Sequence, residues 1–180
     1  MKVEKTSLEG VLLIKPEPVA DGKGEFHADQ RRVFLETYNE SKYKDLGIDT
    51  HFVEDDISVS NKNVLRGIHG NSETWKLISC IHGKVFFVAV DCGKESSTFG
   101  KWESFDLSDE NYLRVLIPPM YGSSYLTLTD KAIVQYKQSS YYNPETQFAY
   151  KWDEPTFNIK WPTENPILSP RDAGTKYIDA

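Results

Sequence analysis

Residues 64–92 read VLRGIHGNSETWKLISCIHGKVFFVAVDC, and this stretch decides the expected fold of the 180-residue chain. It holds three largely apolar runs, at 64–69, 75–82 and 84–92, separated by polar or glycine-containing breaks. Short runs that are rich in β-branched and aromatic residues and bounded by such breaks predict strands. Because the three runs follow each other so closely, we expect their strands to pair antiparallel.

The same pattern of short apolar runs and breaks continues on both sides of this stretch. Further strands are expected at 11–14, 50–60, 102–107, 112–117, 124–129 and 132–139. About eight short strands at this spacing are typical of an antiparallel sandwich or barrel. The chain has no internal repeat and no linker rich in Pro or Ser, so residues 1–180 are expected to form one domain.

Two other segments depart from the strand pattern. Arg32 to Asp45 has helical spacing and is followed by Gly47, which predicts a helix that ends at a glycine. Residues 21–26 (DGKGEF) are typical of a turn that enters a strand. The last third of the chain is rich in Trp, Pro and Asn, and we expect it to wrap the strands as irregular chain.

Composition and charge argue against several classes of protein. The chain is 39% apolar and 27% charged, which is typical of a globular protein, and its net charge is −6. It has no cluster of Lys and Arg, so no nucleic-acid partner is expected. No apolar run approaches the roughly 20 residues that a membrane helix needs, and we see no secretion signal. Cys80 and Cys92 show no metal or redox spacing, so a reduced cytoplasmic setting is expected.

Known motifs leave one histidine as a candidate for catalysis. The chain has no dinucleotide-binding G-x-G-x-x-G, no phosphate-binding P-loop and no G-x-S-x-G nucleophile turn. His27 and His51 lie in polar, turn-like surroundings, and His82 closes an apolar strand. His69 ends the strand at 64–69 beside small residues, where an imidazole can serve as a general base. Taken alone, a single strand histidine is more often structural.

The surroundings of His69 lead to two further expectations. Regular alternation along the strand would point Arg66 and His69 to opposite faces. A His-x-His metal site is ruled out because residue 71 is Asn, and the turn at 118–124 contains no histidine. Since one imidazole is a poor transition-metal site, no metal is expected.

Many separate motifs, in order along residues 10–173, resemble the dTDP-4-keto-6-deoxyglucose 3,5-epimerases. They are VLRGIH (64–69), WKLI (75–78), GKVFFVAVD (83–91), STFGKW (97–102), IPP (117–119), YK (136–137), YYNP (141–144), KWDEP (151–155), IKWP (159–162) and LSPRD (168–172). The resemblance implies a mostly β, cupin-type double-stranded β-helix (jelly roll) with one or two short helices. It also implies a homodimer that acts on a nucleotide-linked 4-keto sugar without metal or cofactor.

The resemblance assigns roles that match the chemistry of such an epimerase. A proton must leave a carbon next to a ketone and return on the opposite face of the sugar. His69 would be the base, and Asp172 would orient its imidazole. Lys76 would lie near the enolate oxygen, and Tyr136 would return the proton. Arg66 would contact the diphosphate, whose oxygens suit a planar guanidinium.

Departures from the family pattern bear on the nucleotide. The further substrate contacts that the resemblance implies are Lys23, Phe26, Glu54, Asp56, Asn71, Ser123 and Tyr142. Ser123 stands where the family has a second histidine, Lys23 where it has an arginine, and 54–56 (EDD) where it has Gln-Asp-Asn. Carboxylates accept from the N1–H and amino group of guanine, donors that thymine lacks. A GDP-linked sugar is therefore favoured over a dTDP-linked one, as in the branch that acts on GDP-4-keto heptoses for bacterial capsule and other surface polysaccharides.

The sequence thus predicts an epimerase that inverts C3, C5 or both in a nucleotide-linked 4-keto-6-deoxy sugar or heptose. One alternative is a non-catalytic sugar-binding cupin, which would keep the barrel but lose the base. Another is a cupin isomerase that acts on a free sugar, for which a diphosphate contact at Arg66 would have no use. Uptake of solvent deuterium into candidate sugars discriminates between these functions.

Overall fold

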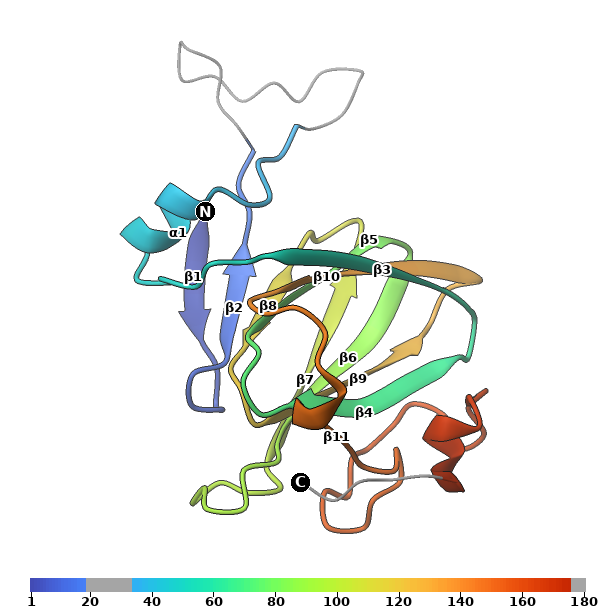
Figure 1. The fold of residues 1–180 in the computed structure, drawn as a ribbon. Coiled ribbons are helices and arrows are strands. Elements are labelled where there is room, and N and C mark those ends of the chain that lie inside the picture. The colour runs from blue at the N-terminus through green and yellow to red at the C-terminus, as the bar shows by residue number, and fades with distance from the viewer. Residues whose placement is uncertain (19–33, 176–180) are drawn as a thin grey trace.

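The computed structural model describes residues 1–18 and 34–175, and it is built from two antiparallel sheets (Figure 1). The six-stranded sheet has the order β1-β2-β8-β5-β10-β3, and the five-stranded sheet has the order β11-β4-β9-β6-β7. The strands are β1 (Lys2–Lys5), β2 (Leu12–Lys15), β3 (Glu54–Asn61), β4 (Leu65–Asn71), β5 (Lys76–His82), β6 (Lys84–Asp91), β7 (Trp102–Ser108), β8 (Arg114–Ile117), β9 (Tyr121–Thr127), β10 (Lys131–Gln138) and β11 (Gln147–Ala149). The helical elements are α1 (Glu40–Asp45), η1 (Pro144–Thr146) and η2 (Arg171–Thr175).

The expectation of a mostly β, antiparallel fold with few short helices is confirmed. Each of the strands predicted from apolar runs is present, with ends that move by up to four residues. The two strands that the sequence did not predict, β1 and β11, have only four and three residues. Strands that short carry too little periodicity to distinguish them from loops.

The main core lies between the two sheets. Phe87, on the interior strand β6, pairs with Phe105 on one side and Tyr125 on the other. The inner face of the opposite sheet contributes Ile78 and Val134, which are both fully buried. The inward-facing side chains of both sheets therefore fill one shared interior, as expected for two packed sheets.

The predicted helix at Arg32 to Asp45 is much shorter than expected. Helix α1 begins after Asn39, whose side-chain oxygen accepts from the amide of Lys42 at 3.3 Å, a typical N-cap contact. Residues 34–39 are not helical, and Phe34 is 75% exposed instead of facing the core. The predicted stop is correct, because Gly47 follows the helix with a φ of 81°.

The last third of the chain is mostly irregular, as predicted, and it returns to the five-stranded sheet. Strand β11 pairs with β4 and interrupts the irregular path. Beyond it, the indole N–H of Trp161 donates to the carbonyl of Trp152 at 2.8 Å and fixes a loop. The short turn η2 then lies against β4 (Figure 1). The predicted turn at 21–26 lies outside the described residues.

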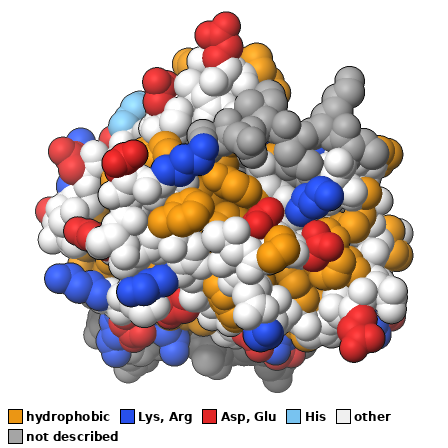
Figure 2. Space-filling view, turned by 90° about the horizontal axis from the view of Figure 1, so that it is seen from below, with side chains coloured by type: hydrophobic (Ala, Val, Ile, Leu, Met, Phe, Trp, Pro, Cys, Tyr) orange, Lys and Arg blue, Asp and Glu red, His pale blue; other side chains and the backbone are white. Residues whose placement is uncertain are grey.

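Surface charge on one face agrees with the lack of a basic cluster in the sequence. On the face seen from below in Figure 1, lysine and arginine side chains lie mostly apart, separated by acidic, hydrophobic and neutral ones (Figure 2). Within residues 1–18 and 34–175, no helix is long and apolar enough to cross a membrane. Both cysteines are free and buried, and burial raises the pKa of Cys80 to about 11 and of Cys92 to about 12.

A second, smaller core under α1 gives a test of packing. Ile14 on β2 is fully buried and packs with Tyr43 of α1. We expect Ile14→Val to lower the free energy of unfolding by about 1 kcal/mol and Ile14→Ala by about 2–5 kcal/mol. Urea unfolding measures both, and Ile167→Val, at a side chain that is 56% exposed, should change stability by less than about 0.5 kcal/mol. Equal losses at Ile14 and Ile167 would contradict this packing.

Candidate active site

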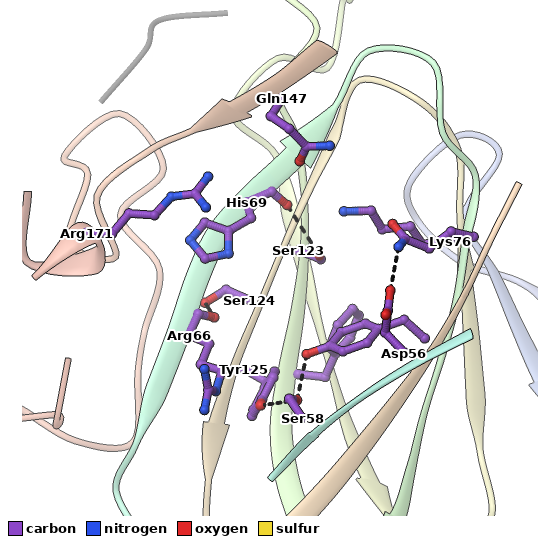
Figure 3. A pocket seen from close by; sticks show the side chains of 13 residues that line it. Asp56, Ser58, Arg66, His69, Lys76, Ser123, Ser124, Tyr125, Gln147 and Arg171 are labelled. Atoms are coloured by element: carbon purple, nitrogen blue, oxygen red, sulfur yellow. Dashed lines mark hydrogen bonds between the residues drawn. The ribbon is translucent and has the colours of Figure 1, made fainter. Parts of the chain in front are cut away.

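A cavity of about 250 Å³ opens between the two sheets. Both sheets and the C-terminal part of the chain line it, and most of the lining side chains are polar or charged (Figure 3). They are Asp56 and Ser58 of β3, Arg66 and His69 of β4, Lys76 of β5, Phe87 of β6, Ser123, Ser124 and Tyr125 of β9, Tyr136 and Gln138 of β10, and Gln147 and Arg171.

An irregularity in β4 brings Arg66 and His69 into the same cavity. The ladder between β4 and β9 shifts register between these two residues, so the predicted regular alternation is wrong here. Ile68 points the other way and is fully buried in a separate apolar cluster. Gly67 has a φ of 116°, and a Cβ there would lie 2.6 Å from the carbonyl oxygen of Ser123. A glycine at 67 therefore permits the close approach of β4 to β9.

His69 forms a short hydrogen bond with a buried carboxylate. Its Nε2 lies 2.6 Å from Oδ1 of Asp172, whose side chain is only 4% exposed. The hydroxyl of Ser169 donates to the other carboxylate oxygen at 2.9 Å. Burial alone would raise the pKa of Asp172, but the hydrogen bonds and charge from His69 and the bond from Ser169 lower it below its usual value. The carboxylate is thus ionised and fixes the imidazole.

Three cationic side chains surround the histidine. Arg66 and Arg171 lie on either side of His69, and Lys76 lies across the cavity (Figure 3). Within the described residues, none of the three cations forms an ion pair with a carboxylate. Desolvation by burial and the positive charge of Arg171 lower the pKa of Lys76 to about 8, although Asp56 opposes the shift. The cavity therefore holds a local excess of positive charge in a chain whose net charge is −6.

Tyr136 faces the cavity from the six-stranded sheet and is part of a chain of hydroxyl groups. Its hydroxyl lies 2.8 Å from Oγ of Ser58, which lies 2.7 Å from the hydroxyl of Tyr125. Burial, first of all, and the neighbouring Tyr125 raise the pKa of Tyr136 well above its usual value. The phenol is therefore protonated at neutral pH.

Asp56 and Glu54 share one amide partner but differ in their position. Nε2 of Gln138 donates to a carboxylate oxygen of each at 2.7 Å. Asp56 lines the cavity, whereas Glu54 does not, and a second oxygen of Glu54 accepts from the amide of Tyr142 at 3.3 Å. Of the two carboxylates expected to face a base, only Asp56 is at the cavity wall.

The other predicted substrate contacts divide into three groups. Ser123 lines the cavity, and its hydroxyl donates to the carbonyl of His69 at 3.2 Å. Asn71 and Tyr142 do not line it: Asn71 is 3% exposed and Tyr142 is 69% exposed. The side-chain oxygen of Asn71 accepts from two backbone amides of the following turn, at 2.7 and 2.9 Å, which is a structural role. Lys23 and Phe26 lie outside the described residues.

Sequence reasoning missed several lining residues. Arg171 immediately precedes Asp172 in the LSPRD motif, and the predicted role of Asp172 could have pointed to it. Ser58 lies two residues after Asp56 on β3, and strand alternation would have placed both on one face. Nothing in the sequence pointed to Tyr125 or Gln147.

The arrangement suits proton transfer at a carbon beside a carbonyl group. It holds an imidazole on one wall, a protonated phenol on the opposite wall and three cationic side chains in the same lining. In the part of the chain that the structure describes, no three His, Cys, Asp or Glu side chains cluster as metal ligands.

Comparison with known proteins agrees with this chemistry. The family model described as dTDP-4-dehydrorhamnose 3,5-epimerase matches residues 5–179. The dTDP-4-dehydrorhamnose 3,5-epimerase of Escherichia coli strain K12 is 40% identical over 184 residues, which cover 99% of this chain and 95% of the relative. A dTDP-4-dehydrorhamnose 3-epimerase of Streptomyces niveus is 33% identical over 96% of this chain and 81% of the relative.

The crystal structure of a relative also matches this chain. The dTDP-6-deoxy-D-glucose-3,5-epimerase of Legionella pneumophila, in complex with dTDP-4-keto-L-rhamnose, matches with a TM-score of 0.85 and 36% identity. The match covers 96% of this chain and 89% of that protein. With its fold, its cavity and nearly its whole length in agreement, this chain belongs to the dTDP-4-dehydrorhamnose 3,5-epimerase family of nucleotide-sugar epimerases.

Proposed function

We propose that this chain inverts C3 and C5 of a dTDP-linked 4-keto-6-deoxy sugar, with His69 as the base and Tyr136 as the acid. One observation carries the proposal: both side chains line one cavity, but they come from different sheets. A sugar ring between the two sheets would have one face toward the imidazole and the other toward the phenol. Inversion needs removal and return of a proton on opposite faces, which this arrangement supplies.

The base works through the nitrogen that Asp172 leaves free. Because Nε2 of His69 is held by Asp172, Nδ1 is available to take the proton from the carbon next to the C4 ketone. The C–H bond breaks, its electron pair moves into the ketone as an enolate, and the imidazole becomes an imidazolium. The buried carboxylate of Asp172 stabilises that positive charge without taking the proton itself.

Lys76 stabilises the enolate oxygen. Its lowered pKa of about 8 keeps it mainly protonated at neutral pH, and the lowered value also makes it a better proton donor. In the water-poor interior between the sheets, a cation beside developing negative charge is stabilising. Tyr136 then gives its proton to the carbon from the other face. The imidazolium of His69 releases its proton to water, and the tyrosinate regains a proton from water.

Tyr136 is the acid for both carbons. Ser123 stands where the family pattern has a second histidine, and its hydroxyl is bound to the carbonyl of His69. A serine hydroxyl is a far weaker acid than an imidazolium, so it does not replace that histidine. Tyr136 is therefore the one acid proposed for both C3 and C5.

Arg66 and Arg171 bind the diphosphate. Both are exposed at the cavity, and their planar guanidinium groups suit phosphate oxygens. They flank His69, so a diphosphate held between them would place the attached sugar next to the base (Figure 3). Such a clamp would have no use with a free sugar.

Two observations support different nucleotides in the substrate, thymidine and guanine. The ligand of the Legionella relative supports thymidine. Asp56 supports guanine, since one of its oxygens is bound by Gln138 and the other can accept from the base. Glu54 gives weaker support, because it is away from the cavity and already has two partners. We take the dTDP-linked sugar as the substrate. The GDP-linked 4-keto heptose stays a prediction, which the comparison of thermal protection by dTDP and GDP tests.

The enzyme acts as a homodimer. Strand β3 is an edge of the six-stranded sheet, and its Ile57 and Val59 are 63% and 50% exposed. An exposed apolar edge strand is a ready surface for pairing with another chain. A second copy of this chain would cover it in a symmetric contact on the same strand that carries Asp56 and Ser58.

Replacing the base separates an enzyme from a sugar-binding protein. We expect His69→Asn to fold normally and to lose carbon–deuterium exchange at both centres by about a hundredfold or more, because a general base contributes about 10²–10⁴ in rate. Mass spectrometry and NMR of the sugar in D₂O measure the exchange. The control is His51→Asn, since His51 is exposed and bound to Glu40 away from the cavity. Exchange at the wild-type rate in His69→Asn would remove His69 from the mechanism.

Thermal protection identifies the nucleotide. We expect dTDP to raise the melting temperature more than GDP does at equal concentration, because a ligand that binds only the folded state stabilises it more the more tightly it binds. Asp56→Asn is the matched variant. A larger shift with GDP that disappears in Asp56→Asn would overturn the thymidine assignment and support the GDP-linked sugar.

The lowered pKa of Lys76 makes stability depend on pH in a defined window. Below about pH 8 both the folded and the unfolded chain hold this proton, and the penalty for burying the ammonium is fully present. Between about pH 8 and the ordinary lysine value of about 10.4, the unfolded chain keeps a proton that the folded chain has released. The free energy of unfolding therefore rises with pH across this window, relative to that of Lys76→Met.

Urea unfolding of both proteins at unit steps from about pH 7 to about pH 10 measures this difference. Lys131→Met is the control, because Lys131 is exposed at the start of β10. A stability difference between wild type and Lys76→Met that does not change across the window would contradict the burial of a charged Lys76.

A further inference from the structure

We infer that Ser58, itself oriented by Tyr125, is a positioning residue that aims the phenol proton of Tyr136 into the cavity and stabilises the tyrosinate left behind. This inference rests on the proposed role of Tyr136 as the acid. Neither Ser58 nor Tyr125 needs to touch the reacting carbons of the sugar. Ser58 acts through the oxygen of Tyr136, and Tyr125 acts through Ser58.

The inference starts from a continuous chain of hydrogen bonds between the two sheets. Nε of Arg66 donates to Oγ of Ser60 at 3.0 Å, and Ser60 lies 3.1 Å from the hydroxyl of Tyr125. Tyr125 lies 2.7 Å from Ser58, and Ser58 lies 2.8 Å from Tyr136 (Figure 3). The serines are on β3 and Tyr136 on β10, whereas Arg66 and Tyr125 are on β4 and β9. This series of hydrogen bonds therefore connects the sheet that carries the base to the sheet that carries the acid.

The guanidinium gives this chain a direction. Arg66 can only donate, and each hydroxyl has one proton to donate. If Ser60 donates to Tyr125, Tyr125 to Ser58 and Ser58 to Tyr136, every hydroxyl inside the chain uses its proton. The opposite order would leave the proton of Ser60 without an acceptor at a side chain that is 4% exposed, which is unfavourable. In the favoured order the proton of Tyr136 is the one left over, and it points to the cavity.

The same chain stabilises the oxygen after the proton has gone. When the O–H bond of Tyr136 breaks and the carbon takes the proton, negative charge develops on a buried oxygen. The hydroxyl of Ser58 already donates to that oxygen, and a hydrogen bond to a charged group is stronger than one to a neutral group. Burial, first of all, and the neighbouring Tyr125 raise the pKa of Tyr136, whereas the Ser58 hydrogen bond and the Arg66 charge act to lower it. Water later returns the proton to the phenolate.

Arg66 thereby takes part both in diphosphate binding and in orienting the acid. Its Nε donates to Ser60, and one of its terminal nitrogens donates to the carbonyl of Val59 at 3.3 Å. A guanidinium has five N–H groups, so others remain for a phosphate. A diphosphate that holds Arg66 in place also holds the first donor of the chain, which links substrate binding to the orientation of the acid.

The test compares inversion with exchange in Ser58→Ala and Tyr125→Phe. We expect both variants to keep deuterium exchange, because His69 can remove and return a proton on its own face. We expect kcat for inversion at C5 to fall about tenfold or more in Ser58→Ala, since a hydrogen bond to a charged oxygen is lost. KM should be unchanged, and Ser58→Thr, which keeps the hydroxyl, should restore inversion.

The control is Thr127→Val on β9. The hydroxyl of Thr127 is buried and has no hydrogen-bond partner among the described residues, so its removal tests the loss of a buried hydroxyl as such. We expect this variant to keep both inversion and exchange. In the double variant Ser58→Ala/Tyr136→Phe, inversion should fall no further than in Tyr136→Phe, because Ser58 acts only through Tyr136.

Different outcomes separate this inference from the proposed function. Normal inversion in Ser58→Ala together with lost inversion in Tyr136→Phe would overturn the positioning role and leave the acid in place. Normal inversion in Tyr136→Phe would remove the acid and the inference with it. Equal losses of exchange and inversion in Ser58→Ala would show a general structural role and would also overturn the inference.

Discussion

The hydrogen bond between His69 and Asp172 is the interaction on which the rest of the site depends. It joins residues that are 103 positions apart, one on a strand of the five-stranded sheet and one in the turn that ends the described chain. Without this hydrogen bond the imidazole would lose the contact that orients it. The turn that carries Asp172 and its neighbour Arg171 would lose one of its links to β4. The irregular last third of the chain is therefore a support that carries two functional side chains back to the sheet.

Local sequence patterns were sufficient for the framework but not for the details of β4. Short apolar runs between polar or glycine breaks identify strands such as β6, which is buried on both faces and needs no alternation to be recognised. The shift of register between Arg66 and His69 could not be predicted, since it depends on how closely Gly67 approaches β9. A single glycine in a strand is compatible with a bulge, a close approach or neither.

The helix and the site show the same division between local and long-range information. The spacing of residues 32–45 is helical, but the side chain of Asn39 caps a backbone amide and starts α1 late. The pairing of His69 with Asp172 followed from the family resemblance, not from strand patterns. Tyr125 and Gln147 line the cavity because of the tertiary fold, which no window of sequence contains.

The contrast between the cationic cavity and the acidic chain has a consequence for how substrate arrives. Beyond a Debye length of about 8–10 Å, a nucleotide diphosphate meets a molecule of net charge −6 and is weakly repelled. Near Arg66 and Arg171, which line the cavity, the field becomes attractive. Added salt therefore weakens the distant repulsion as well as the close attraction. The association rate of this enzyme should depend on ionic strength much less than that of a protein whose whole surface attracts its ligand.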